Sequence, residues 1–213
     1  MKLIIFTLFL LLNALAVNAQ HKLIYSDTRF QYVLTVDSVL TTDSVNYDCV
    51  VKSIKILTIK NHKLIQVIIP EENHPFCNLP QNQLFIMEDM NFDGINDIRL
   101  VQFLPAAANV PYYCWIYDTA ANRFIRNKAL EKITSPDFDP KKKLIFSFWQ
   151  ASCCDHGLST YKYINGHPTL IEQSEFAEDE VDTSKYILTV KKLINGKWKR
   201  TKTIEKRESS SNQ

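Results

Sequence analysis

Ile164-Asn165-Gly166 and Ile194-Asn195-Gly196 are two copies of one short sequence, thirty residues apart. Asn-Gly between alternating apolar residues is the strongest short-range signal for a β-hairpin, because both residues accept the positive φ angles of a two-residue turn. Outward from these turns, most of the chain consists of short alternating, β-branched or aromatic segments that end at turn residues. Examples are Leu144 to Trp149, Tyr112 to Tyr117, Val51 to Ile59 and Leu64 to Ile69. Together they predict hairpins that turn near residues 61, 94, 120, 140, 165 and 195.

This turn spacing of about 20 to 35 residues predicts an all-β protein made of antiparallel hairpins, in a propeller-like or related β architecture. The chain has only four glycines, and helical periodicity is scarce. We therefore expect at most one short helix, near Ala129 to Ile133 and ahead of Ser135-Pro136.

The first 19 of the 213 residues have the features of a signal peptide. Lys2 is followed by the apolar run Leu3 to Leu12, and Val17-Asn18-Ala19 provides small residues for cleavage. We expect a periplasmic or secreted protein with one β-rich domain over residues 20–207, a disordered tail over 208–213, and no membrane span after signal removal. The formal net charge of +2 gives no reason to expect a nucleic-acid partner.

The five cysteines are candidates for disulfides, since an exported chain meets oxidising conditions. They are Cys49, Cys77, Cys114, Cys153 and Cys154, and the odd number leaves at least one over. Cys49 and Cys77 flank the predicted hairpin of residues 50–69, so this pair is our first choice. A bridge from Cys114 to Cys153 or Cys154 is the second, and the sequence leaves the connectivity open.

The most specific motif is the loop Asp89-Met90-Asn91-Phe92-Asp93-Gly94-Ile95-Asn96-Asp97, which lies between two predicted strands. Side-chain oxygens stand at loop positions 1, 3, 5 and 9, with glycine at position 6, which is the spacing of a calcium-binding loop. The predicted ligands are Asp89, Asn91, Asp93, the carbonyl of Ile95, and Asp97 directly or through water. Position 12 is Leu100, so the site lacks the last glutamate of an EF-hand. We expect calcium to stabilise the fold here; a polar turn without metal is the alternative.

The sequence contains no convincing catalytic motif. Cys153-Cys154-Asp155-His156 is a candidate nucleophile or metal site, but the usual zinc spacings are missing, and a disulfide-anchored loop is the better interpretation. The C-terminal part of the chain contains two segments of opposite charge. Glu172 to Asp182 has six acidic residues and no basic one, whereas Lys185 to Arg207 has nine basic residues and one acidic one. Both are read first as solvated surface, and the acidic segment secondly as a guide for a cationic partner.

The calcium loop resembles the hairpins of FG-GAP and VCBS-type β-propeller repeats. A longer series is similar to a family of exported bacterial proteins typified by the periplasmic immunity protein of a bacterium-killing type IV secretion system. It comprises Phe85 to Gly94, Tyr113 to Asp118, Asn122 to Phe124, Leu130, Ser135 to Asp139, and Tyr161 to Gly166, and so covers about residues 84 to 175.

The resemblance implies a binding protein rather than an enzyme: an inhibitor of a lysozyme-like peptidoglycan hydrolase that places a rigid loop in the enzyme's cleft. It also implies the same calcium ligands, on Asp89, Asn91, Asp93, Ile95 and Asp97. Our candidate contact segments are Gln150 to Ser159, with Cys154, Asp155 and His156 at its centre, and Pro105 to Pro111. The alternative is a calcium-bearing surface module that binds glycan or protein without inhibiting an enzyme.

Overall fold

The computed structural model describes residues 19–40, 47–75, 79–106, 108–152, 154–179, 181–182 and 185–206. The predicted signal peptide up to residue 18, the tail over 208–213, Cys77 and Cys153 lie outside the described residues. The described strands form three antiparallel sheets, of four, four and six strands.

The first sheet contains β1 (Ala19–Ser26), β2 (Phe30–Leu40), β3 (Tyr47–Thr58) and β4 (Leu64–Ile68), paired in chain order. Alternate residues of β2 enter the core, and Phe30, Tyr32, Leu34 and Val36 are at most 3% exposed. The hairpin of β3 and β4 is the one predicted to turn near residue 61. Strands β1 and β2 were not assigned from the sequence, although the alternation from Phe30 to Val36 is a strand signal.

The second sheet follows a four-residue helix, α1 (Gln81–Leu84), and pairs its strands in chain order. They are β5 (Phe85–Glu88), β6 (Asp97–Val101), β7 (Tyr112–Asp118) and β8 (Arg123–Arg126). All five residues of β6 are buried, because this strand is central and packed on both faces. The loop between β5 and β6 is the predicted calcium loop.

The third sheet begins after the 3-10 helix η1 (Leu130–Lys132), which lies within the predicted helical turn. Its six strands also pair in chain order, so β9 and β14 are its edges. They are β9 (Pro136–Asp139), β10 (Leu144–Gln150), β11 (His156–Ile164), β12 (His167–Glu178), β13 (Lys185–Ile194) and β14 (Lys197–Lys206). Both Asn-Gly turns have positive φ at each residue, as predicted: 50° and 78° in the first, 51° and 73° in the second.

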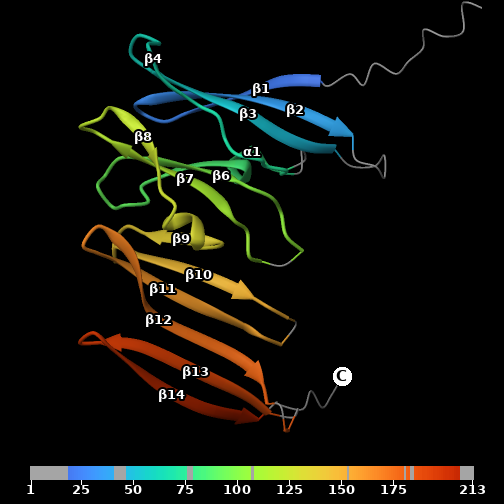
Figure 1. Cartoon of the computed structure of the whole chain (residues 1–213), viewed down its shortest axis with the longest axis vertical. Helices are drawn as coiled ribbons and strands as arrows, with labels where there is room; N and C mark the ends of the chain where they lie inside the picture. Colours follow the sequence, from blue (N-terminus) through green and yellow to red (C-terminus); the bar gives the residue numbers. More distant parts are fainter. Residues whose placement is uncertain are drawn as a thin grey trace, which may run out of the picture.

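The second sheet lies between the other two (Figure 1). One buried cluster joins its first face to the first sheet and includes Tyr32, Phe85 and Trp115. A second cluster, with Met90, Cys114 and Ile145, joins its other face to η1, β9, β10 and β11. Strands β12 to β14 extend away from the first two sheets, and β14 is the strand that lies farthest from them (Figure 1).

The all-β prediction is confirmed, and each of the six predicted turns joins two antiparallel strands. The three sheets follow one another along the chain as propeller blades do. None of the described residues form a helix with the length and hydropathy of a membrane span.

Candidate functional site

Three side chains of the 89–97 loop turn inward, onto the loop's own backbone amides. Asp89 accepts hydrogen bonds from the amides of Asp93 (3.0 Å) and Gly94 (2.7 Å). Asn91 accepts from the amide of Asp93 (3.1 Å), and Asp93 accepts from the amide of Ile95 (2.8 Å). One Asp89 oxygen and the Asn91 oxygen thus approach the same amide nitrogen. The sequence placed these three oxygen donors together, and the structure brings them together.

Asp97, the last predicted ligand, has a different environment. Its side chain is fully buried, and its two oxygens accept hydrogen bonds from the amides of Met90 (2.9 Å) and Tyr117 (2.8 Å). Asp97 therefore ties the start of the loop to β7. Burial raises the pKa of this carboxyl group to about 7, although the two amides lower it, and the nearby Asp93 and Asp89 raise it further. A cation in the loop would relieve this repulsion.

The loop also contacts the third sheet. Met90 is fully buried in the second core cluster, and the ring of Phe92 packs edge-on against Tyr163 (6.1 Å between centroids) and Phe138 (6.4 Å). Phe92 adopts a φ of 63°, which is uncommon for a residue with a side chain, so tertiary packing holds it there. The loop is thus fixed to β7 on one side and to β9 and β11 on the other.

The donor set fits a hard cation in part. Calcium prefers carboxylate, amide and carbonyl oxygens, and Asp89, Asn91 and Asp93 supply such oxygens at one point of the loop. Among the described residues, however, no three acidic, histidine or cysteine side chains converge as a metal site, because Asp97 faces the amides of Met90 and Tyr117. Asp89, Asn91 and Asp93 are therefore the residues that would hold calcium. The ligand roles of Ile95 and Asp97 stay predictions.

A cavity of about 450 Å³ lies beside the loop. It is lined by residues of the loop, of β7 and β8, and of the β11–β12 hairpin: Asn91, Ile116, Asp118, Ile125, Arg126, Asn127, Tyr163 and Gly166. The Tyr163 hydroxyl is buried and has no hydrogen-bond partner among the described residues. The cavity offers a hydroxyl, an amide and a carboxylate to a bound molecule.

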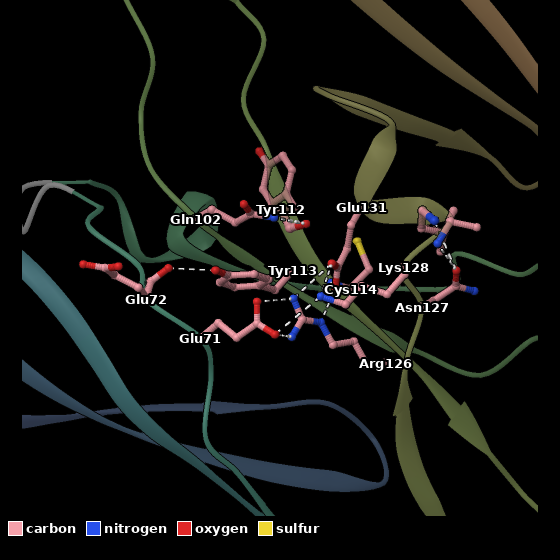
Figure 2. Close-up of polar contacts among 12 residues, drawn as sticks. Glu71, Glu72, Gln102, Tyr112, Tyr113, Cys114, Arg126, Asn127, Lys128 and Glu131 are labelled. Atoms are coloured by element: carbon pink, nitrogen blue, oxygen red, sulfur yellow. Dashed lines mark hydrogen bonds and ion pairs between the residues drawn. The ribbon is translucent and has the colours of Figure 1, made fainter.

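Arg126, the cationic residue of this cavity, is already paired. Its guanidinium makes two hydrogen bonds to Glu131 (2.6 and 3.1 Å), contacts both oxygens of Glu71, and lies 4.7 Å from the centre of the Tyr113 ring (Figure 2). Lys128 adds contacts to Glu71 (3.5 Å) and Glu131 (3.4 Å). This network fastens the segment after β4 to the second sheet. Because its charges are balanced internally, it does not make the cavity an anion site.

The cysteines separate into different environments. Cys49 is disulfide-bonded, and its amide donates to the carbonyl of Pro75 (2.8 Å), two residues before Cys77. Cys77 lies outside the described residues, so the Cys49–Cys77 pairing stays a prediction. Cys114 is a buried free thiol, and burial raises its pKa to about 12. The predicted bridge from Cys114 to Cys153 or Cys154 is therefore wrong: Cys114 belongs to the second core cluster and packs there as a small apolar residue.

The described residues of the predicted contact segment, Cys154, Asp155 and His156 among them, lie between β10 and the start of β11. The Ser152 hydroxyl contacts the Asp155 carboxylate (3.1 Å) and accepts from the amides of Cys154 (3.2 Å) and Asp155 (3.0 Å). His156 begins β11, and its ring lies between two aromatic rings, those of Phe148 (6.0 Å) and Phe176 (5.1 Å). The turn and the histidine thus occupy the end of the third sheet.

Phe148, His156, Phe176 and Tyr186 form a row of rings across β10, β11, β12 and β13, which we call the aromatic row. The spacing between Phe176 and Tyr186 is 4.6 Å. Sequence reasoning missed this row, because it depends on the register of four strands, which local sequence patterns do not encode. Phe148 lies near the end of a predicted strand, but Phe176 lies in the acidic segment that was interpreted as solvated surface.

Comparisons with known proteins gave one informative result. No family model matches the chain, and no curated protein matches it. A solved structure described as a Xanthomonas type IV secretion system related protein has a similar fold, with a TM-score of 0.65. The alignment covers 86% of this chain and 94% of that one, at 19% sequence identity. At this identity the similarity shows a shared fold over nearly the whole of both chains.

Proposed function

We propose that this protein is an exported binding protein that inhibits a lysozyme-like peptidoglycan hydrolase, as an immunity protein does, and that calcium in the 89–97 loop stabilises it. The observation that carries the proposal is the similarity of the whole fold to a protein related to a type IV secretion system. The same system was implied by the resemblance of residues 84–175.

The calcium part of the proposal is supported by the position of the loop. Its oxygens gather on Asp89, Asn91 and Asp93, while Phe92 and Asp97 join it to two different sheets. A cation held there would fix the junction between those sheets. A rigid scaffold loses less entropy when it binds a partner, so the ion would raise affinity without contacting the partner.

Binding, rather than catalysis, is supported by the surroundings of the buried thiol and of two residues beside Cys154, the candidate nucleophile. Cys114 is a buried thiol of raised pKa, hence a poor nucleophile. His156 contacts two phenylalanine rings, and Asp155 is used in a turn. These groups serve packing and turn formation.

The test is a muramidase assay with the purified mature protein. Chicken-, goose- and phage-type lysozymes would be followed by the clearing of a cell-wall suspension, with and without the protein, in calcium and in chelator. We expect stoichiometric inhibition of at least one type, weaker in chelator. An unrelated β protein at the same concentration is the control.

The alternative, a calcium-bearing module that binds glycan or a surface protein without inhibition, predicts a different pattern. Lysis would proceed unchanged with all three enzymes, while the protein would sediment with purified peptidoglycan. That result would replace the inhibitor proposal with the surface-module proposal.

A further inference from the structure

The hairpin of β13 and β14 concentrates basic charge at one end of the molecule. Residues 185–204, which we call the basic hairpin, contain seven of the chain's 25 lysine and arginine residues and none of its 23 acidic residues. The rest of the chain is therefore net negative, although the whole chain carries +2. The hairpin also lies at the end of the third sheet that is farthest from the other two sheets (Figure 1). An anionic surface would attract this end and repel the remainder, so the charge distribution sets an orientation.

Two pairs of like charges face each other across the basic hairpin. Lys191 is directly opposite Arg200, and Lys192 is directly opposite Lys199. Lys192 has an acidic partner, Glu172, at 2.9 Å. No acidic side chain of the described residues pairs with Lys191, Lys199 or Arg200. Like charges directly opposite each other destabilise a sheet, and a phosphate placed between them replaces repulsion with charge-assisted hydrogen bonds.

Lys191 and Arg200 share their face of the hairpin with exposed apolar side chains. Alternate residues of a strand point to the same face. On the face of Arg200, β14 therefore presents a row of exposed side chains: Trp198, Arg200, Lys202 and Ile204. Trp198 is 49% exposed and Ile204 is 57% exposed. The row is about 20 Å long, and two basic side chains lie between its two apolar ends.

The other acids near the basic hairpin lie beside its open end, away from the turn, or in the neighbouring strand. Lys185 pairs with Asp182 at 2.7 Å, and Lys202 lies near Asp179. Glu175 of β12 is on the same face as the row, but it forms no ion pair with a described basic residue. The three basic residues without an acidic partner, which lie nearer the turn, therefore keep their positive charge.

The mixture of side chains favours a lipid surface over a soluble polyanion. Phosphate groups of either kind would fit between Lys191 and Arg200, whose charged groups donate hydrogen bonds to phosphate oxygens. Only a lipid surface also removes aliphatic side chains from water, and Ile194, beside the turn, and Ile204 are 41% and 57% exposed. Trp198 lies between these two along the chain, and tryptophan is enriched where headgroups meet acyl chains. The same combination of basic, tryptophan and aliphatic residues is typical of elements that lie in a membrane interface.

From these observations we infer that the basic hairpin binds the surface of an anionic lipid membrane, with Lys191 and Arg200 on a headgroup phosphate and Trp198 in the interface. The contact is peripheral. The inference goes beyond the proposed function and does not depend on it, because it concerns where the protein is held and not what it inhibits. Each basic residue close to an anionic membrane raises the affinity about fivefold at low salt.

The test measures the binding of the full mature chain to vesicles by co-sedimentation. Vesicles of phosphatidylcholine alone are compared with vesicles that also contain phosphatidylglycerol, in low and in high salt. The double variant Lys191→Gln/Arg200→Gln removes the charged pair, and Trp198→Ser removes the exposed ring. Tryptophan emission is recorded with and without vesicles, because a ring that enters the interface emits at shorter wavelength.

The matched controls remove the same kinds of side chain near the β3–β4 turn. Lys60→Gln/Lys63→Gln removes two exposed lysines that form no ion pair with a described residue. Leu64→Ser removes an apolar side chain that is 52% exposed. Circular dichroism melting shows that each variant is folded. If the first double variant does not fold, Lys197→Gln/Lys199→Gln replaces it, since both of these lysines are exposed.

We expect binding to the anionic vesicles in low salt, much weaker binding in high salt, and none to phosphatidylcholine alone. Lys191→Gln/Arg200→Gln should weaken binding by about tenfold or more, because two charges are lost. Trp198→Ser should weaken it several-fold and abolish the shift in emission. Both controls should bind as the parent does.

The inference is wrong if the parent does not bind the anionic vesicles, if it binds neutral vesicles equally well, or if Lys191→Gln/Arg200→Gln binds like the parent. It is also wrong if soluble polyphosphate binds as tightly as the vesicles and Trp198→Ser leaves vesicle binding unchanged, because the occupant is then a soluble polyanion. None of these outcomes affects the lysozyme assay, so the inhibitor proposal is judged separately.

Discussion

The second and third sheets are both antiparallel and both follow the same chain-order pairing, but they are covered differently. The second sheet has a neighbour on each face, and every residue of its strand β6 is buried. The third sheet is covered only near β9 to β11, and no residue of β12 falls below intermediate exposure. The covered sheet carries the loop and the polar anchors that fix the fold, whereas the uncovered sheet presents side chains to solvent.

The second and third sheets also differ in how far their charged side chains are buried. Arg99 in β6 is 8% exposed, contacts Glu88 at 2.5 Å, and donates to the carbonyl of Pro136 at 3.0 Å. Its guanidinium also lies 4.4 Å from the centre of the Tyr112 ring. In the third sheet, the pair of Lys192 and Glu172 is solvent-exposed, with side chains 54% and 39% exposed. A buried pair fixes one arrangement of the sheets, while an exposed pair contributes little to stability. The comparison predicts that substitutions at the covered sheet will unfold the protein and that substitutions on the uncovered sheet will spare its stability.

The largest effect is expected for Asp97→Ala. The change leaves the buried amides of Met90 and Tyr117 without their acceptor, at about 3 to 5 kcal/mol of unfolding free energy for the two together. Urea unfolding followed by tryptophan fluorescence measures the loss. Asp139→Asn is the control, because Asp139 caps the exposed amides of Lys141 and Lys142 in a turn. Equal losses in the two variants would contradict the anchoring role of Asp97.

Calcium is expected to have the next largest effect. At a concentration 100 times its Kd, an ion that binds only the folded state adds about 2.7 kcal/mol of stability, which corresponds to a melting temperature higher by roughly 5 to 10 °C for a chain of this size. Asp93→Asn should reduce this shift, and Asp139→Asn should retain it. A melting temperature that is the same in calcium and in chelator would remove the metal from the proposal and leave the loop as a polar turn.

Gly94→Ala should cost less, about 1 kcal/mol, since the substitution strains a φ of +89° without a steric clash. Nothing lies within 4 Å of the position that the added Cβ would occupy. The loss should therefore appear equally in calcium and in chelator, because it resides in the backbone. Thermal melting in both buffers tests this, and a loss several times larger would point to an unrecognised contact.

Phe148→Ser is expected to have the smallest effect on stability, within about 0.5 kcal/mol, because the side chain is 41% exposed. The same urea titration as for Asp97→Ala provides the measurement. A loss comparable to that of Asp97→Ala would show that the third sheet is stabilised by the face that bears Phe148, and would erase the contrast between the two sheets.

Much of this fold could be predicted from local sequence. The Asn-Gly turns, the alternation in β10 and the 3-10 turn near Leu130 depend on neighbours in the chain, so a single sequence contains their signal. Strands β1 and β2 were not predicted, although the alternation from Phe30 to Val36 is a signal of the same kind. The six-strand register of the third sheet depends on pairings between distant residues, which local patterns do not encode.

The candidate site likewise has features that local sequence predicts and features that depend on distant parts of the chain. The spacing of Asp89, Asn91 and Asp93 was sufficient to predict that their oxygens converge, since one loop supplies all three. The anchoring role of Asp97 could not be predicted, because it requires β7 to lie alongside the loop. Likewise, Cys114 was read as a disulfide partner from the export context, and only its burial between two sheets shows why it stays a thiol.

Strand β14 has one consequence for the protein in solution. Among the described strands only β13 pairs with β14, so the other edge of β14 presents backbone groups that could pair with the same edge of another molecule. Its ten residues include Lys197, Lys199, Arg200, Lys202 and Lys206, so two such edges repel each other. This repulsion extends over about 10 Å in 0.1 M salt and shortens to about 3 Å in 1 M salt. At high salt two molecules of this protein should therefore begin to pair through their β14 edges, and this symmetric contact closes as a dimer.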